Sequence, residues 1–310
     1  MAGGGLAVSG LLVVGDLVTD VVALHGKPLA PDTDTSARIA VRPGGSAANT
    51  AAWAARAGAD VRLLARVGAD SASWHREALA DVGVRPILRI DPVRPTAVVI
   101  ALVDAAGERT MVTDRGASGA LGPSDWDDAL LDGVARLHLS GYLLFTEAGR
   151  ALAALAVGRA RARGLGVSLD PASTGFLHEF GVPRFRRLLE QLGGVDLLFP
   201  NLDEARMLTD RRNPEQAACA LSADWGCLVA LKLGADGVLL AEDGSLLGVV
   251  PAPRGPVQDT TGAGDAFAGG YLAAALAGST ALAAAVAGCR GGAEAVSVVG
   301  GRPAVGSAGT

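Results

Sequence analysis

The sequence has little net charge, few aromatic residues and few side chains that bind soft metals. Its 310 residues carry a net charge of −5, and aromatic residues make up 4% of them. A mildly acidic chain lacks the broad positive surface of most nucleic-acid-binding proteins, so no nucleic-acid partner is expected. The three cysteines, Cys219, Cys227 and Cys289, have no metal-like spacing and are odd in number, which favours a reducing cytoplasm. The four histidines are scattered, so no zinc site is expected.

One long segment without charged residues has the length of a membrane span. No charged side chain occurs between Ala266 and Cys289. Most of the segment is Ala and Gly, which are weakly apolar, and Gly278-Ser279-Thr280 interrupts it like a turn. We therefore predict two buried helices joined by a short loop, and no contact with a membrane. The apolar residues 6–15 lack a positively charged flank, which predicts a first strand rather than a signal peptide.

Short β-branched runs alternate with longer helical patterns along most of the chain. Strands are predicted at 11–15, 61–66, 136–140, 166–170, 195–200 and 227–233, and helices at 46–57, 71–82, 147–163, 185–192 and 214–225. Half of the residues are apolar, which is ample for a core. This alternation predicts an α/β fold, doubly wound, with a mostly parallel sheet and helices on both faces. No linker or repeat divides the chain, so residues 1–310 are expected to form one domain.

Two stretches depart from this alternation. Residues 21–41 and 96–113 are strand-like without an intervening helix, and the second holds a turn at 104–107. They could be extra antiparallel strands that leave the main sheet and form a small flap. They could equally be an edge hairpin of the same sheet, and the pattern alone does not separate the two.

The segment from Asp259 to Gly270 places small residues just before a helical pattern. Gly262, Ala263 and Gly264 let backbone N–H groups turn toward one point, which makes an anion site at a helix N-terminus. Asp265 follows in the first turn, where a carboxylate could accept a proton from a hydroxyl that attacks a phosphate. A glycine-rich turn with an ordinary helix-start aspartate would explain the same short motif.

Two further motifs precede predicted helices. Gly44 and Gly45 would let a ligand approach the backbone, and Asn49 offers a donor and an acceptor one turn later, although a helix entry with Ser46 as N-cap explains the same residues. Asn201 follows a predicted strand and could cap the next helix. Together with Glu204 it could instead hold hydrated Mg²⁺, which prefers oxygen ligands.

In combination, these motifs resemble those of the ribokinase (PfkB carbohydrate kinase) family. The Gly44-Gly45 segment with Asn49 and the 259–265 segment are similar to the two signatures of that family, and Asn201 with Glu204 matches its Asn-x-x-Glu motif. The resemblance implies a ribokinase-like domain with a small β-sheet lid from about 17–42 and 95–115. It implies transfer of the γ-phosphate of ATP to a hydroxymethyl group, with Asp265 as general base and the amides of Gly262, Ala263 and Gly264 as anion hole.

The resemblance also assigns binding roles. The substrate would be bound by Asp16, Asp20, Gly44, Gly45, Asn49 and Arg115, and the nucleotide by Asn201, Lys232, Gly234 and Thr261. Mg²⁺ would be held by Asn201 and Glu204 through water, and K⁺ by Asp259 and Thr261 with the 296–303 loop. Lys27 and Lys232 are the only lysines, and Lys232 could also be a single solvated side chain. Lids of this family often pair, so a homodimer through the lid is expected.

The acceptor is the least determined part of this prediction. Ribokinases usually carry Gly-Gly-Lys-Gly-Ala-Asn where this chain has Gly-Gly-Ser-Ala-Ala-Asn, so ribose is not favoured over ketohexoses, sugar acids or nucleosides. The expected lid holds few aromatic residues for a base, which favours a free sugar or sugar acid over a nucleoside. A sugar-binding sensor without turnover is the alternative outside enzymes. The sequence lacks the glycine pattern of a nicotinamide-dependent dehydrogenase and the Gly-x-Ser-x-Gly of a hydrolase.

Overall fold

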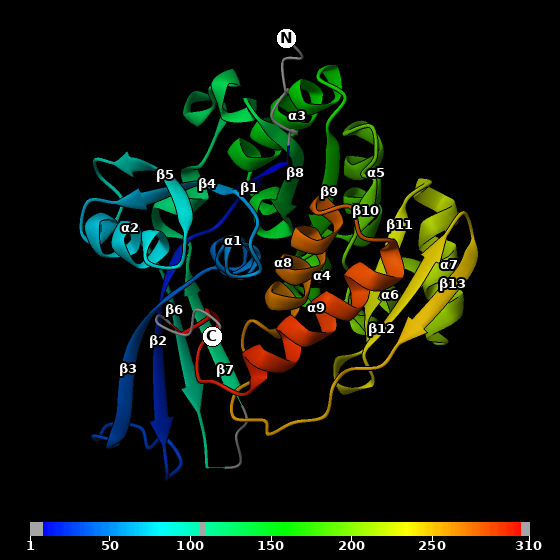
Figure 1. Ribbon diagram of the computed structural model, residues 1–310. Helices are drawn as coiled ribbons and strands as arrows, with labels where there is room; N and C mark the ends of the chain where they lie inside the picture. The colour runs from blue at the N-terminus through cyan, green and yellow to red at the C-terminus, as the bar shows by residue number, and fades with distance from the viewer. Residues whose placement is uncertain (1–8, 106–108, 305–310) are drawn as a thin grey trace.

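The computed structural model describes residues 9–105 and 109–304 and contains a large and a small β-sheet (Figure 1). The strand order of the large sheet is β13 (Ser245–Val250), β12 (Val238–Glu242), β11 (Leu228–Lys232), β10 (Leu197–Leu198), β9 (Gly166–Asp170), β8 (Val134–Ser140), β1 (Gly10–Val14), β4 (Val61–Gly68) and β5 (Val84–Asp91). The pairs from β11 to β5 are parallel, and β12 and β13 extend the sheet antiparallel at one edge. The predicted fold class is confirmed.

Three strands of the large sheet were missed by the pattern analysis. β5 contains Pro86 and two arginines, so it lacks a continuous apolar run. β12 and β13 form a hairpin around Asp243 and Gly244, which have φ values of 50° and 75°. An Asp-Gly pair with two positive φ angles is a typical two-residue hairpin turn, so this signal was present in the sequence.

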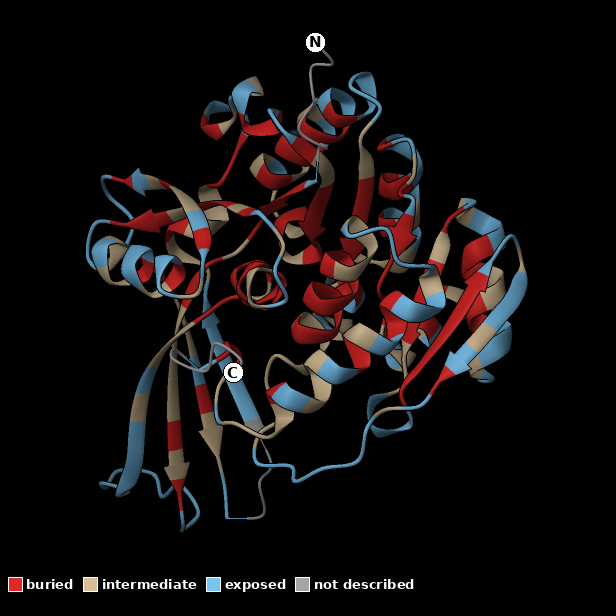
Figure 2. Cartoon of the chain, in the orientation of Figure 1, coloured by how far each residue is buried: buried red, intermediate tan, exposed pale blue. Residues whose placement is uncertain are grey.

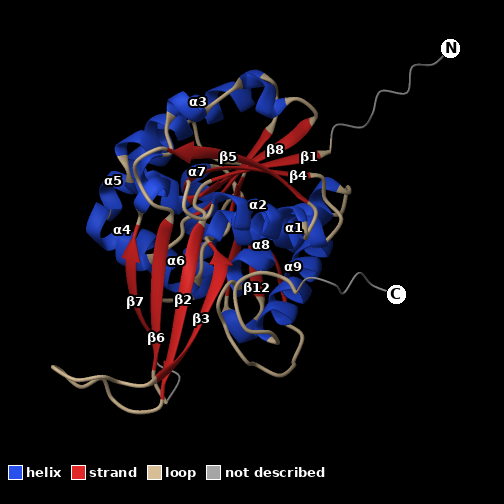
Figure 3. Cartoon of the chain, turned by 90° about the vertical axis from the view of Figure 1, so that its left-hand side faces the viewer, coloured by secondary structure: helices blue, strands red, loops and turns tan. Residues whose placement is uncertain are grey.

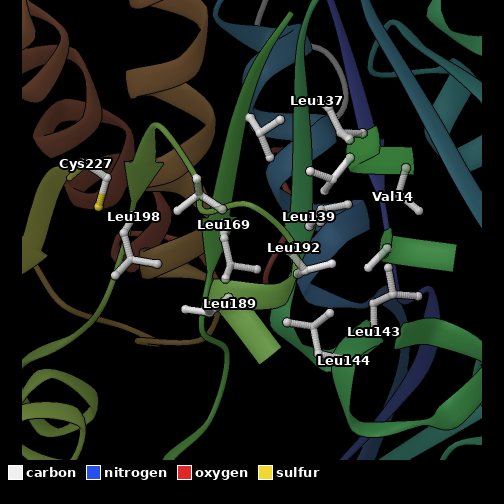
Figure 4. Packing of buried hydrophobic residues seen from close by; sticks show 14 of the residues in the cluster. Val14, Leu137, Leu139, Leu143, Leu144, Leu169, Leu189, Leu192, Leu198 and Cys227 are labelled. Atoms are coloured by element: carbon white, nitrogen blue, oxygen red, sulfur yellow. The ribbon is translucent and has the colours of Figure 1, made fainter. Parts of the chain in front are cut away.

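Helices cover both faces of the large sheet, and each layer has its own core. One face carries α3 (Glu147–Ala162), α4 (Thr174–Phe180), α5 (Val182–Gln191), α6 (Leu202–Thr209) and α7 (Pro214–Trp225), and the other carries α1 (Ser46–Arg56), α2 (Ala72–Ala80), α8 (Ala263–Leu276) and α9 (Ala281–Val296). Short 3₁₀ helices occur at Gly116–Ala120, Pro123–Asp125, Asp128–Leu131, Gly141–Phe145 and Gly234–Asp236. Figure 4 shows leucines of strands and helices interlocking in the first core, and Figure 2 shows buried residues concentrated along the sheet.

The charge-free segment forms two helices joined by a short loop, as predicted, but the second is only half buried, with Leu282 and Val286 exposed. α8 ends at Leu276 and α9 begins at Ala281, and the two pack against each other and against α1. Glycines allow this close approach, since a Cβ on Gly269 would lie 2.7 Å from the backbone of Thr50 and Ala54. Among residues 9–105 and 109–304, no helix combines the length and apolarity needed to cross a membrane.

The small sheet is separate from the large one and projects from one end of it (Figures 1 and 3). Its strand order is β3 (Ala37–Gly44), β2 (Val18–His25), β6 (Ala97–Val103) and β7 (Arg109–Asp114). The flap interpretation is therefore right and the edge hairpin is wrong. Part of the predicted turn at 104–107 lies outside the described residues.

One pairing in the small sheet corrects the expectation of antiparallel strands. β2 and β6 run parallel, whereas β3 and β7 pair with them antiparallel. The reason is topological, because β2 follows β1 and β6 follows β5, and β1 and β5 run in the same direction in the large sheet. Their continuations leave that sheet in the same direction and therefore pair in parallel.

Candidate active site

A cavity of about 660 Å³ lies between the carboxyl ends of the large-sheet strands and one face of the small sheet. Ligands of open α/β sheets bind at this end of the strands. The predicted residues that line the cavity are Asp16, Asp20, Gly45, Asn49, Arg115, Asn201, Glu204, Lys232, Gly234, Thr261, Gly262, Gly264 and Asp265. Gly44, Ala263 and Asp259, which were also predicted, are not among the residues that line it. The fold thus gathers residues from distant segments into one site.

Asp265 lies in the first turn of α8 and faces the cavity. Ser46 Oγ donates to its Oδ1 over 2.8 Å, and Asn49 Nδ2 donates to its Oδ2 over 2.9 Å. Burial raises the pKa of Asp265 to about 7, with a contribution from Asp170, while the two hydrogen bonds and Lys232 oppose the rise. A carboxylate with such a pKa can take up and release a proton near neutral pH.

The N-terminus of α8 has the form expected of an anion site. Gly262 is the N-cap with φ 73°, and a Cβ there would lie 2.6 Å from Cα of Gly301, so only glycine fits. The first N–H groups of a helix lack intrahelical acceptors. Ala263 differs from its neighbours, because its N–H donates to the carbonyl of Thr260 over 3.4 Å. The backbone N–H groups of Gly262 and Gly264 are therefore better placed than that of Ala263 to bind an anion in the cavity.

Asp16 holds the start of α1. Its carboxylate accepts hydrogen bonds from the N–H groups of Ser46 and Ala47 over 2.6 and 3.2 Å, and from Ser140 Oγ over 2.8 Å. The N-cap of α1 is Gly45, with φ 101°, and the expected N-cap Ser46 is already helical. Glycine is required at the cap because a Cβ would lie 2.7 Å from the carbonyl oxygen of Asp16. Asp16 therefore orders the glycine loop, in addition to lining the cavity.

Asp20 differs from Asp16, because no hydrogen bond to its carboxylate is formed within the described residues. It lies on β2, over Gly44, where a Cβ would overlap the carboxylate. On the other side of Gly44, the buried Arg302 donates to the Gly44 carbonyl over 2.9 Å. Burial raises the pKa of Asp20 to about 6, and the charge of Arg302 limits this rise.

Asn49 contacts Asp265, although it was predicted to contact the substrate. Its side chain is 4% exposed, its amide nitrogen binds Asp265, and its Oδ1 has no hydrogen-bond partner within the described residues. The nitrogen is thus used to orient a carboxylate. The oxygen is buried, so the contact that the structure shows for this side chain is the one with Asp265.

Asn201 and Glu204 form a capping box at the start of α6, which confirms the interpretation of Asn201 as a helix cap. Asn201 Oδ1 accepts from the Glu204 N–H, and the Glu204 carboxylate accepts from the Asn201 backbone and side-chain nitrogens, at 2.7 to 2.9 Å. Burial raises the pKa of Glu204, and Asp170 adds to the rise. The described part of the chain holds no cluster of three His, Cys, Asp or Glu residues suited to a metal.

Lys232 pairs with a carboxylate, so the interpretation as a solvated side chain is wrong. Lys232 Nζ lies 2.5 Å from Asp170 Oδ2, and both side chains are mostly buried. Burial alone would lower the pKa of Lys232, but the charges of Asp170 and Glu204 raise it above its usual value. Gly234, with φ 62°, follows at the same side of the cavity.

Asp259 and Thr261 form a closed turn before α8. Asp259 Oδ1 accepts from the N–H and Oγ1 of Thr261, and its Oδ2 accepts from the N–H of Gly300 over 2.9 Å. The predicted K⁺ ligands and the C-terminal loop are thus brought together. The hydrogen bonds of Asp259 with Thr261 and Gly300 hold the turn closed.

Arg115 lines the cavity and lies against aromatic rings. Its guanidinium carbon is 4.3 Å from the ring centre of Phe176 and 5.9 Å from that of Phe145. Within the described residues it forms no ion pair. Burial lowers the pKa of Arg115, and the charge of Glu179 opposes this shift. Tyr142 and Phe176 line the cavity beside it.

Sequence reasoning missed several residues of the site. It did not identify Ser46 as a partner of Asp265. It also did not place Asp170, Tyr142, Phe176 or Arg302 in the site. Asp170 could have been found, because it ends a predicted strand at the edge where α/β proteins bind ligands. Arg302 gave no signal, since its role depends on a contact between residues 258 positions apart.

Comparison with known proteins gives a consistent result. The family model for the pfkB family carbohydrate kinases matches residues 9–306. A 2-dehydro-3-deoxygluconokinase of Thermoproteus tenax is 30% identical over 76% of this chain and 73% of its own length. A cytidine kinase of Thermococcus kodakarensis is 30% identical over 85% of this chain and 87% of its own. The solved structure of a ribokinase from Thermotoga maritima has a similar fold, with a TM-score of 0.78 and 24% identity, over 95% of this chain and 96% of that one.

Proposed function

We propose that this chain, which belongs to the pfkB family of carbohydrate kinases, moves the γ-phosphate of ATP to a hydroxymethyl group of a sugar or sugar acid. That it is an ATP-dependent kinase follows from the family and from the named activities of its relatives. The observation that carries the finer proposal is the carboxylate of Asp265, which faces the cavity at the N-terminus of α8.

In the proposed step, Asp265 accepts the proton of the acceptor hydroxyl while the oxygen of that hydroxyl bonds to the γ-phosphorus. The bond from that phosphorus to the β,γ-bridging oxygen breaks, and ADP leaves. Backbone N–H groups at Gly262 and Gly264 would stabilise charge on the transferring group, where preorganised donors have their largest effect. Ser46 and Asn49 orient the carboxylate through the hydrogen bonds described above.

Two metal ions belong to this proposal. Glu204 is buried within its capping box but lines the cavity, so Asn201 and Glu204 fit a role in holding the water molecules of Mg²⁺ rather than the ion itself. Mg²⁺ would supply positive charge to the phosphates. Asp259, Thr261 and the neighbouring loop offer oxygen atoms suited to K⁺, and a dependence of the rate on KCl over NaCl would test that site.

The pH dependence of turnover follows from Asp265. Its pKa is raised to about 7, so below that pH it is protonated and cannot accept the proton of the acceptor. We expect kcat to rise as the pH increases through about 7 and to level off above it. Initial rates at saturating substrates between pH 5.5 and 9 measure this profile, with calorimetry of ATP binding over the same range to separate binding from transfer. A rate that falls between pH 6 and 8 would contradict the assignment.

The chemistry of the cavity favours a sugar or sugar acid. The Asp20 carboxylate can accept hydrogen bonds from sugar hydroxyls, and the unpaired charge of Arg115 could bind the carboxylate of a sugar acid. Both groups line the cavity, Asp20 from β2 and Arg115 from the position after β7. A small acceptor that spans them would present its hydroxymethyl group to Asp265.

A nucleoside is the second candidate, because the cavity contains aromatic residues that the sequence did not place there. Tyr142 lies in the 3₁₀ helix that follows β8 and Phe176 lies in α4, so neither belongs to the small sheet. The scarcity of aromatic residues in the predicted lid therefore does not exclude a base. A base could stack on these rings, as bases commonly do on aromatic side chains.

A coupled assay for ADP over pentoses, ketohexoses, 2-keto-3-deoxygluconate and nucleosides tests the proposal. We expect turnover of a sugar or sugar acid, and if it is a sugar acid, Arg115→Gln should raise its KM about tenfold or more, the scale of one charge-assisted pair. If only nucleosides are phosphorylated, the acceptor is a nucleoside and not a sugar or sugar acid. ATP binding without turnover of any acceptor would favour a sugar-binding sensor.

We propose that the small sheet acts as a lid over the acceptor. Val18, Asp20 and Val99 of this sheet line the cavity, and a lid that excludes water limits hydrolysis of ATP. ATP consumption is expected to be low without acceptor and strongly stimulated by it. Equal consumption under both conditions would show that the sheet does not control the reaction.

The other face of the small sheet supports a homodimer. Val41, Val21, Ile100 and Val112 are directly opposite one another in adjacent strands, and Val41 and Val112 are more than half exposed. Pairing of two such faces would bury them. Light scattering is expected to give twice the chain mass, and Val41→Asp should give a monomer. Leu247→Asp, on exposed β13 of the large sheet, is the control, and a monomeric parent protein would refute the dimer.

A further inference from the structure

Asp170 and Lys232 form a buried ion pair at the nucleotide side of the cavity. Asp170 ends β9 and Lys232 ends β11, and the short strand β10 lies between them, followed by Asn201. Lys232 Nζ and Asp170 Oδ2 are 2.5 Å apart, and the two side chains are 13% and 8% exposed. Both line the cavity. The pair is thus placed at the carboxyl ends of two strands, with one face open to a ligand.

The ammonium group of Lys232 lies against the first turn of α8. A Cβ built on Gly264 would be 3.2 Å from Lys232 Nζ, so the ammonium lies close to this turn and a side chain there would displace it by a few tenths of an ångström. An ammonium has three N–H donors. One is used by Asp170, and within the described residues no second acceptor is bonded to Nζ. The remaining donors are available beside the backbone of the predicted anion site.

A lysine side chain needs help to hold such a position. It has four rotatable bonds and loses about 2 kcal/mol of rotamer entropy when it is fixed in one conformation. Asp170 provides a fixed, buried acceptor that selects one conformation before any ligand arrives. An ammonium held in this way is preorganised for an anion, which is the general source of tight and rapid recognition.

We propose that Asp170 is a positioning residue that holds the ammonium of Lys232 beside Gly264, where its free N–H groups bind the phosphate oxygens of the nucleotide. This inference rests on the proposed function, because it takes the ligand at this place to be a nucleotide. Asp170 acts through Lys232 and does not itself touch the phosphates. Its loss should therefore weaken nucleotide binding and transfer only while Lys232 is present.

The chain offers a conservative variant for the test. Asp170 Oδ1 accepts the N–H of Ala172 over 3.1 Å, and Ala172 has φ 83°, so this hydrogen bond supports a strained turn. Asp170→Asn keeps an oxygen for that bond and places an uncharged NH2 group, which cannot accept a hydrogen bond, toward Lys232. A structural role of Asp170 in the turn would survive the change, whereas the positioning role would not.

A double-mutant cycle measures whether Asp170 acts through Lys232. We expect Asp170→Asn to lower kcat/KM for ATP about tenfold, and Lys232→Met to lower it about a hundredfold. In the Lys232→Met background, Asp170→Asn should cause no further loss. The same tenfold loss in both backgrounds would overturn the proposal, as would an unchanged kcat/KM in Asp170→Asn. If Lys232→Met does not fold, Lys232→Gln replaces it in the cycle.

A second readout needs no acceptor and no turnover. Because Lys27 and Lys232 are the only lysines, ¹³C-lysine labelling gives two side-chain signals, which Lys27→Arg assigns. We expect the Lys232 signal to shift on addition of ATP, and Asp170→Asn to move it toward the value of free lysine and to raise the calorimetric Kd for ATP about tenfold. An Asp170→Asn protein with an unaltered Lys232 signal and unaltered Kd would refute the inference. If no acceptor is ever phosphorylated, the proposed function fails while these two measurements still decide the role of Asp170.

Discussion

Replacing Asp265 with asparagine is expected to lower kcat by about 10²- to 10⁴-fold while ATP affinity stays near that of the parent protein. Loss of a general base typically has an effect of this size. Asparagine has nearly the same shape, and its single oxygen can accept from Asn49 while its NH2 group donates to the Ser46 hydroxyl, so the amides at the start of α8 should remain in place. Steady-state kinetics with a turned-over acceptor and calorimetry with ATP measure the two quantities.

Asp236→Asn is a suitable control, because Asp236 is exposed and lies in the 3₁₀ helix after β11, outside the cavity lining. It should leave kcat unchanged. An Asp265→Asn protein that keeps more than about a tenth of the parent turnover would remove Asp265 from the chemical step, since such a loss is below the usual range for a general base.

Gly262→Ala is expected to damage both stability and transfer. The Cβ would lie 2.6 Å from Cα and 2.7 Å from the carbonyl oxygen of Gly301, and alanine at φ 73° is strained. The strain alone is about 1 to 3 kcal/mol, and the displaced backbone should turn the amide donors away from the phosphoryl group. Loss of one such donor lowers kcat by about 10²- to 10³-fold. Thermal unfolding and steady-state kinetics give the two effects.

Gly255→Ala provides a matched control in the same connection between β13 and α8. Its Cβ would meet nothing within 4 Å, so neither stability nor kcat should fall. If Gly262→Ala lowers the melting temperature but leaves kcat unchanged, the turn at Gly262 is structural and the anion hole lies elsewhere.

Much of the fold could be predicted from the local pattern. Strand–helix alternation predicted the parallel sheet, and the Ala- and Gly-rich composition of 266–289 predicted two packed helices rather than a membrane span. The two departures from alternation predicted extra strands, but they did not separate a small sheet from an edge hairpin and did not predict the parallel pairing of β2 with β6. That pairing depends on where β1 and β5 end in the large sheet, which no local pattern contains.

The candidate site divides in the same way. The position of Asp265, of the glycines before it and of the Asn201–Glu204 cap at helix starts could be predicted, because these motifs are local in the sequence. The contacts of Asp265 with Ser46 and Asn49 could not, because they join distant segments. The alternatives for Lys232 could not be separated, since its partner Asp170 is 62 residues away.

By itself the sequence determined the α/β class and the glycine-rich turn with Asp265 at a helix start, because helix starts and strand periodicity are properties of a few adjacent residues. Only the tertiary structure decided which groups are free to bind a ligand. It ties Asp16 to the start of α1, leaves the Asp20 carboxylate facing the cavity, and uses the Asn49 amide nitrogen for Asp265. The reason is that hydrogen-bond partners and burial are set by contacts between distant segments, and these contacts also set the charge state of each group.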